Sequence, residues 1–118
     1  MAADTFGTFN VGVGHMTLRT NTSGDYNTAT GDEALAFNTA GSYNTATGYQ
    51  TLNVNSTGMY NTATGYYALN ANKTGNYNTA TGYRALMNNS VGTYNVAMGQ
   101  DALIWNSSGS GKIGRAHV

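Results

Sequence analysis

The sequence predicts an all-β fold, a parallel β-solenoid (β-roll) of six coils with 17 residues in each coil. The motif Gly-x-Tyr-Asn-Thr-Ala-Thr-Gly-x-x-Ala-Leu-x-x-Asn-x-x repeats without insertion or deletion over residues 7–108. A unit of this length cannot hold two packed helices, or a strand with a crossover helix, because these need roughly 30 residues. The chain has 16 Gly and no Pro, which suits tight corners and a backbone whose N–H groups are all needed for hydrogen-bonded ladders.

The first strand of each coil is expected over Tyr-Asn-Thr-Ala-Thr, because Thr and Tyr favour strands and Gly bounds the segment on both sides. In the central units this segment covers residues 26–30, 43–47, 60–64 and 77–81. A second, shorter strand is expected around the Ala-Leu pair, with Gly and Asn at the corners. Residues 32–37 alone resemble a helical turn, but the other units do not, so no helix is expected.

Side chains alternate between the two faces of a strand, which separates Asn and Ala from Tyr and Thr. We expect the strand Ala and the Leu of each unit to fill a narrow interior, and Asn to form amide ladders from coil to coil. The expected interior leucines are Leu18, Leu35, Leu52, Leu69, Leu86 and Leu103. The other side is termed the Tyr-x-Thr-x-Thr face and is expected to be an interface or a ligand face. It comprises Tyr26, Thr28, Thr30, Tyr43, Thr45, Thr47, Tyr60, Thr62, Thr64, Tyr77, Thr79 and Thr81.

The repeat array leaves short segments at both ends of the chain. Residues 1–6 are expected to form a lead-in, and they lack the charged and apolar regions of a secretion signal. Residues 109–111 begin a truncated seventh unit. Residues 112–118 match the translation of a common short-read sequencing adapter, so we expect them to be foreign to the repeat. The solenoid prediction therefore excludes them.

Composition argues against most other classes of protein. The net charge is zero and only 8% of the residues are charged, which disfavours binding to nucleic acid or to an anionic membrane. Without Cys there is no disulfide scaffold and no thiolate metal site. No apolar run approaches the roughly 20 residues of a membrane span, so no membrane insertion is expected.

Residues that could carry chemistry are few. His15 is isolated, and no nucleophile, base and orienting group can be combined, so no enzymatic activity is expected. We expect no cofactor and no metal, because calcium-binding β-rolls need a recurrent Asp and this repeat has Asn instead. Glycosylation patterns follow from the Asn-rich and Thr-rich composition and mean little on their own. They occur at Asn21, Asn55, Asn72, Asn88 and Asn106.

The first and last units differ from the central ones on the Tyr-x-Thr-x-Thr face. Both Thr are replaced, by Val11 and Val13 in the first unit and by Val96 and Met98 in the last. Apolar residues at these positions indicate that the face is buried there, and on a thin coil this implies another chain.

Residues 10–14 and 95–99 resemble the Asn-x-Val-Ala-Ile-Gly repeats of trimeric autotransporter adhesin heads, the YadA-like family. The units also resemble repeats of phage tail-fibre-like and bacterial surface proteins. The resemblance covers residues 7–108, although the coils here are longer and the central units carry Thr in place of Val or Ile. It implies a left-handed β-roll that associates as a homotrimer on the surface of a cell or virion, as part of a longer chain. It also implies a structural or adhesive role, with a surface glycan or a host receptor as a partner.

Two alternatives stay open. The stacked Thr-Ala-Thr segments form a grid of hydroxyls and methyls, which resembles the Thr-x-Thr faces of ice-binding β-solenoids. The column of Tyr rings offers aromatic surface to sugar rings or to a neighbouring chain, and it also suits a purely structural ladder.

Overall fold

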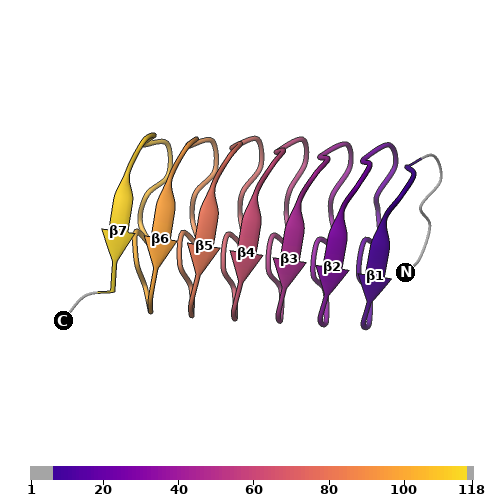
Figure 1. Cartoon of the computed structure of the whole chain (residues 1–118), viewed down its shortest axis with the longest axis horizontal. Helices are drawn as coiled ribbons and strands as arrows, with labels where there is room; N and C mark the ends of the chain where they lie inside the picture. The colour runs from indigo at the N-terminus through magenta and orange to yellow at the C-terminus, as the bar shows by residue number, and fades with distance from the viewer. Residues whose placement is uncertain (1–6, 117–118) are drawn as a thin grey trace.

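The computed structural model describes residues 7–116 and confirms the predicted parallel β-solenoid. Seven short strands form one sheet in chain order, and each strand pairs in parallel with the next. They are β1 (Val11–Val13), β2 (Thr28–Thr30), β3 (Thr45–Thr47), β4 (Thr62–Thr64), β5 (Thr79–Thr81), β6 (Val96–Met98) and β7 (Ile113–Arg115). Figure 1 shows them side by side, each followed by a loop that returns to the start of the next strand. Residues 7–116 contain no helix, as expected.

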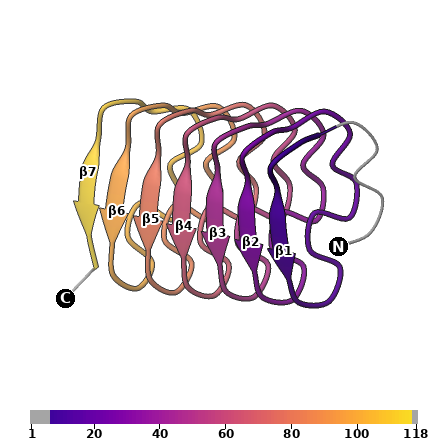
Figure 2. The same ribbon diagram turned by 45° about the vertical axis from the view of Figure 1, so that its right-hand side comes forward.

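The register between coils follows from the constant length of the repeat. Thr45 lies opposite Thr62, and Ala46 lies opposite Ala63. The same relation holds along the sheet, so identical side chains stack into columns. Figure 2 shows the strands following one another along the long axis. The molecule is accordingly elongated, with extents of 42 × 22 × 16 Å.

The first strand is shorter than predicted, because only Thr-Ala-Thr is extended. The aromatic residue before it, Phe9 in the first coil and Tyr in the others, has a left-handed backbone, with φ of 59° at Tyr43 and 58° at Tyr60. This conformation turns the chain before the strand begins, so the alternation of faces does not extend back to Tyr. Within the strand the alternation is clear, since both Thr are exposed and the Ala between them is buried.

The second strand, expected around Ala-Leu, does not form. Leu52 has φ of 47° and lies in a turn. The backbone there still bonds to the neighbouring coil, as in the 3.1 Å hydrogen bond from Leu52 N to Ala68 O. Stacking therefore supplies the hydrogen bonds of a ladder without an extended chain, and the left-handed residue helps to close the coil.

Strand β7 lies inside the segment that the sequence analysis excluded. The Lys112 carbonyl accepts a 2.8 Å hydrogen bond from Val96 N, and the Lys112 N–H donates to Asn95 Oδ1 at 2.9 Å. Counted from Gly109, residues 113–115 fall at the strand positions of the unit, which brings them into register with β6. The truncated seventh unit, predicted to end at residue 111, therefore continues through the strand of that coil. The adapter origin of the segment stays a prediction, and residues 1–6 and 117–118 lie outside the described residues.

The interior is narrow and is filled by Leu and Ala. Leu18, Leu35, Leu52, Leu69 and Leu86 are fully buried, together with the strand Ala of coils 2 to 6. Leu103, in the last complete coil, is only partly buried. Burying a Leu side chain contributes roughly 1.5–3 kcal/mol, so this column is the main apolar contribution to stability.

Two ladders of Asn also line the interior. In one ladder, the side-chain amide of Asn55 donates to Asn38 Oδ1 at 2.7 Å and to Gly58 O at 2.9 Å. In the other, Asn44 Oδ1 accepts the backbone N–H of Asn61 at 3.0 Å. These bonds satisfy polar groups that would cost roughly 1–3 kcal/mol each if they were buried without a partner. The amide ladders expected from the sequence are therefore present.

The Gly after each strand is required by both its conformation and the close spacing of the coils. Gly48 has φ of 124°, and a Cβ there would collide with the carbonyl oxygen of Gly65 in the next coil. No L-residue meets both conditions, which explains why this position is Gly in all six units.

Candidate functional site

The most regular exposed surface is the outer side of the strands. Thr28, Thr45, Thr62 and Thr79 form one column, and the Thr two residues later form a second. All eight side chains are exposed in the single chain. The columns repeat at the coil spacing of roughly 4.8 Å along the solenoid and at roughly 7 Å along the strand. The result is a flat lattice of hydroxyl and methyl groups.

Apolar side chains lie on the same surface at both ends. Val11 and Val13 are 53% and 58% exposed, and Met98 is 58% exposed. Each is directly in register with a Thr of the neighbouring coil. The hydroxyl-bearing strands β2 to β5 are thus flanked by apolar side chains in β1 and β6, and β7 adds exposed Ile113 and Arg115 beyond β6.

The Tyr of the Tyr-x-Thr-x-Thr face form a continuous stack with Phe9. The ring centroids of successive coils lie 4.8–5.1 Å apart, and the planes are within 12° of parallel. Each ring therefore covers the face of the next, which leaves mainly ring edges to the solvent. The structure separates these Tyr from the Thr strands by the left-handed turn described above. Whether both groups serve one interface stays a prediction.

A second group of aromatic residues was not singled out from the sequence. Tyr49, Tyr66, Tyr67 and Tyr83 contact one another just beyond the ends of three successive strands. A signal was present, because Gly-Tyr recurs in three successive units at a position that otherwise varies. Hydrogen bonding between the side chains of Tyr66 and Tyr67 raises the pKa of Tyr66 above its ordinary value.

Charged side chains form ion pairs at two places on the described surface. His15 Nδ1 lies 2.9 Å from Asp32 Oδ1 at the surface. The Arg84 guanidinium donates to both oxygens of Asp101, at 2.7 and 2.9 Å, which raises the pKa of Arg84. Within residues 7–116, no three His, Cys, Asp or Glu side chains are grouped so that they could hold a metal ion.

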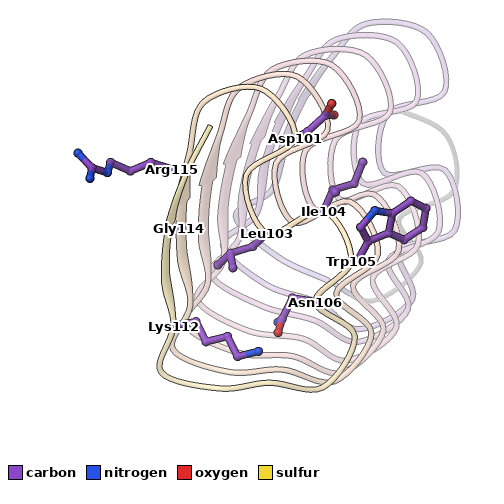
Figure 3. A pocket seen from close by; sticks show the side chains of 8 residues that line it. All are labelled: Asp101, Leu103, Ile104, Trp105, Asn106, Lys112, Gly114 and Arg115. Atoms are coloured by element: carbon purple, nitrogen blue, oxygen red, sulfur yellow. The ribbon is translucent and has the colours of Figure 1, made fainter. Parts of the chain in front are cut away.

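A hollow of about 370 Å³ opens at the C-terminal end of the solenoid. Figure 3 shows Leu103, Asn106 and Lys112 around it, with Arg115 pointing away from the strands. Among the described residues, Asn106 Oδ1 is a buried acceptor without a hydrogen-bond partner. In the preceding coils, the equivalent oxygen accepts from the Asn of the next coil, for example Asn38 Oδ1 from Asn55. The hollow is therefore the open end of the interior ladders rather than a separate ligand site.

Most of the glycosylation patterns lie on the interior Asn ladder. Asn21, Asn55 and Asn72 are fully buried, and Asn106 is 7% exposed. Their Nδ2 groups donate within the coil and so are not presented for modification in the folded chain. Asn88 is half-buried, and its amide donates to the Ile104 carbonyl at 2.9 Å.

Comparison with protein-family models, curated proteins and solved structures finds no match to this sequence. In the part of the chain that the structure describes, no helix is long and apolar enough to cross a membrane. The strand face and the Tyr rings, as the two regular exposed surfaces, are the candidate functional sites.

Proposed function

We propose that the chain is a structural and adhesive segment of a surface fibre or adhesin and has no enzymatic activity. It assembles as a homotrimer through the Tyr-x-Thr-x-Thr face. The observation that carries the proposal is the exposure of Val11, Val13 and Met98 on an otherwise hydroxyl-bearing face. Burial of apolar area contributes roughly 25 cal/mol per Å², so covering these side chains favours association.

The closed trimer, the left-handed winding and the location on a cell or virion surface follow the resemblance to YadA-like heads. Three copies related by an axis along the solenoid would each turn the strand face inward. In this arrangement the contacts are heterologous, since one part of the face meets a different part of the same face on the next chain, and a three-fold rotation closes them into a ring. Thr hydroxyls in the central coils would bond to one another or to water in the seam.

A second candidate function is ice binding by the same Thr columns. It is favoured by the in-register, exposed pairs Thr45–Thr62 and Thr47–Thr64, which form a flat and regular lattice. The Val and Met side chains of the end coils interrupt this lattice. Trimerisation would cover the face, so the two functions exclude each other on one assembly.

The deciding measurements are the solution mass by light scattering and the thermal hysteresis of the full chain. We expect three times the mass of one chain and no hysteresis. A monodisperse monomer with clear hysteresis would overturn the proposal and support ice binding.

Substitutions in one Thr column separate the two functions further. Thr→Val at Thr28, Thr45, Thr62 and Thr79 should preserve or stabilise a trimer seam, because Val already occupies this position in the end coils. Thr→Tyr at the same positions should clash across the axis and dissociate the trimer. On an ice-binding face both sets would leave the chain folded, and Tyr would abolish the hysteresis.

A further inference from the structure

The last complete coil of the repeat, residues 92–108, carries interior groups that the following strand only partly covers. Leu86 and the four Leu before it in the column are fully buried, whereas Leu103 is partly buried. Asn106 Oδ1 is a buried acceptor without a hydrogen-bond partner among the described residues. The Leu86 N–H donates to Ala102 O at 2.9 Å, but the Leu103 N–H makes no equivalent bond in the described part of the chain. This coil therefore presents the contacts of the array without their complement.

These groups line the hollow of about 370 Å³ at the C-terminal end. Figure 3 shows Leu103, Asn106 and Lys112 within the outline of the coil. Leu103 and Ile104 give the hollow an apolar lining, and Asn106, only 7% exposed, adds the unpaired acceptor. A cavity of about 150 Å³ can hold benzene, so this hollow has room for an aliphatic side chain together with an amide. It matches a ligand that brings both groups at a fixed spacing.

The preceding coils show the form of such a ligand. Asn89 Oδ1 accepts a hydrogen bond from Asn106 Nδ2 at 2.9 Å, and Asn72 Oδ1 accepts one from Asn89 Nδ2 at 2.9 Å. In each unit this donor Asn follows the interior Leu by three residues. A segment with Leu-x-x-Asn thus supplies both the apolar side chain and the N–H donor.

Strand β7 adds a backbone edge to the same site. It pairs with β6 on one side and is the last strand of the sheet in residues 7–116. The free edge of a strand offers N–H and C=O groups to an extended polypeptide. In the central units Thr-Ala-Thr begins seven residues after the interior Asn, as Thr79 does after Asn72. One continuous segment can therefore fill the hollow and pair with β7.

We infer that the C-terminal end of the solenoid binds an extended segment of the same repeat from another polypeptide and folds it into an added coil. The segment has the composition of residues 65–81. Its Leu covers Leu103, its Asn amide donates to Asn106 Oδ1, and its Thr-Ala-Thr pairs with β7. A single repeat cannot bury its interior face alone, so the segment acquires this structure only on the template. The inference does not rest on the trimer, because the strand face takes no part in it.

The test is titration of the full chain with a synthetic peptide of residues 65–81. Trp105 is the only Trp of the chain, and the peptide has none. Its side chain is 82% exposed and lines the hollow, so its fluorescence reports directly on this site. We expect a saturable shift of the emission to shorter wavelength, because the added coil covers the indole. Isothermal titration calorimetry should give the same dissociation constant.

Matched controls are available in the peptide and in the protein. A peptide with Leu69→Asp and Asn72→Ala should bind at least about tenfold more weakly, because its carboxylate would enter an apolar hollow. In the protein, Asn106→Ala should weaken binding by about fivefold through loss of one hydrogen bond. Asn70→Ala should leave binding unchanged, since Asn70 does not line the hollow and its amide donates to Gln50 O. Circular dichroism checks that both protein variants are folded.

Absence of binding by both methods, or equal binding of the control peptide, would overturn the inference. Thr45→Lys with Thr62→Lys alters only the strand face and should bind the peptide with unchanged affinity, so failure of this site is distinguishable from failure of the trimer. A folded second copy is the competing occupant. Head-to-tail association of this variant in place of peptide binding, measured by light scattering, would assign the end to that copy instead.

Discussion

The interior ladders and the strand face are built in the same way, from one residue type repeated at each coil, but they differ in how much freedom each residue has. Inside, Asn55 bonds to the coils on both sides and Leu52 is fully enclosed. Outside, Thr45 is exposed and its position carries Val in the end coils. Inside the solenoid each coil must therefore carry the same residue, because buried polar groups can hydrogen-bond only to one another. On the outer face the repeated side chains contact solvent, so they can serve to bind a partner.

The largest effect is expected when a charge enters the interior. Leu52→Asp should destabilise the fold by roughly 3–5 kcal/mol, because the carboxylate would be buried without a partner. Gln50→Lys, two residues away at a half-buried position, places an ammonium group where the Gln50 amide meets Glu33 and should change stability by less than about 0.5 kcal/mol. Chemical denaturation of both variants checks this comparison. Equal damage from the two substitutions would contradict the assignment of inside and outside.

A smaller effect is expected from interrupting the Asn ladder, and the chain offers an internal control for it. Asn55→Ala leaves Asn38 Oδ1, Gly58 O and the Asn72 amide short of a partner. Each such loss costs roughly 1–3 kcal/mol when the group stays buried. Thermal unfolding should therefore show a clear decrease in stability.

Asn106→Ala should reduce the free energy of unfolding by roughly 1–3 kcal/mol less than Asn55→Ala does. The reason is that Asn106 Oδ1 accepts no hydrogen bond, so its removal leaves no donor unpaired. If the two variants melt at the same temperature, the ladder does not act as a chain of coupled bonds.

The smallest effect on folding, with a large effect on assembly, is expected on the strand face. Thr45→Lys with Thr62→Lys should change the stability of the single chain by only about 0.5 kcal/mol, because both side chains are exposed. In a trimer the same ammonium groups would be buried together at several kcal/mol each. Light scattering should therefore report a folded monomer.

Thr57→Lys with Thr74→Lys is the control for charge, since these exposed Thr lie in the same two coils but outside the strands. It should leave the trimer intact. An unchanged trimer mass in the strand-face variant would exclude this surface as the seam.

Several features were predictable because the six units can be compared with one another within one chain. Leu18 and its equivalents are invariant, and so are the Asn of both ladders, which marks them as required in every coil. The second group of aromatic residues was missed for the converse reason, since Tyr49 and Tyr66 stand at a position where other units have His15 or Asp32. Variation between units hides a surface cluster from any consensus of the repeat.

The sequence alone determined the solenoid, the register of its sheet and the identity of each column. A repeat without insertions or deletions returns every residue to the same place one coil later. Only the tertiary structure decided that the strand is three residues long, that Leu52 lies in a turn and that Tyr43 turns the chain before the strand. These points depend on left-handed backbone conformations that L-residues rarely adopt on their own. They persist here because hydrogen bonds and side-chain stacking with the neighbouring coils compensate their cost, and those contacts exist only once the coils are stacked.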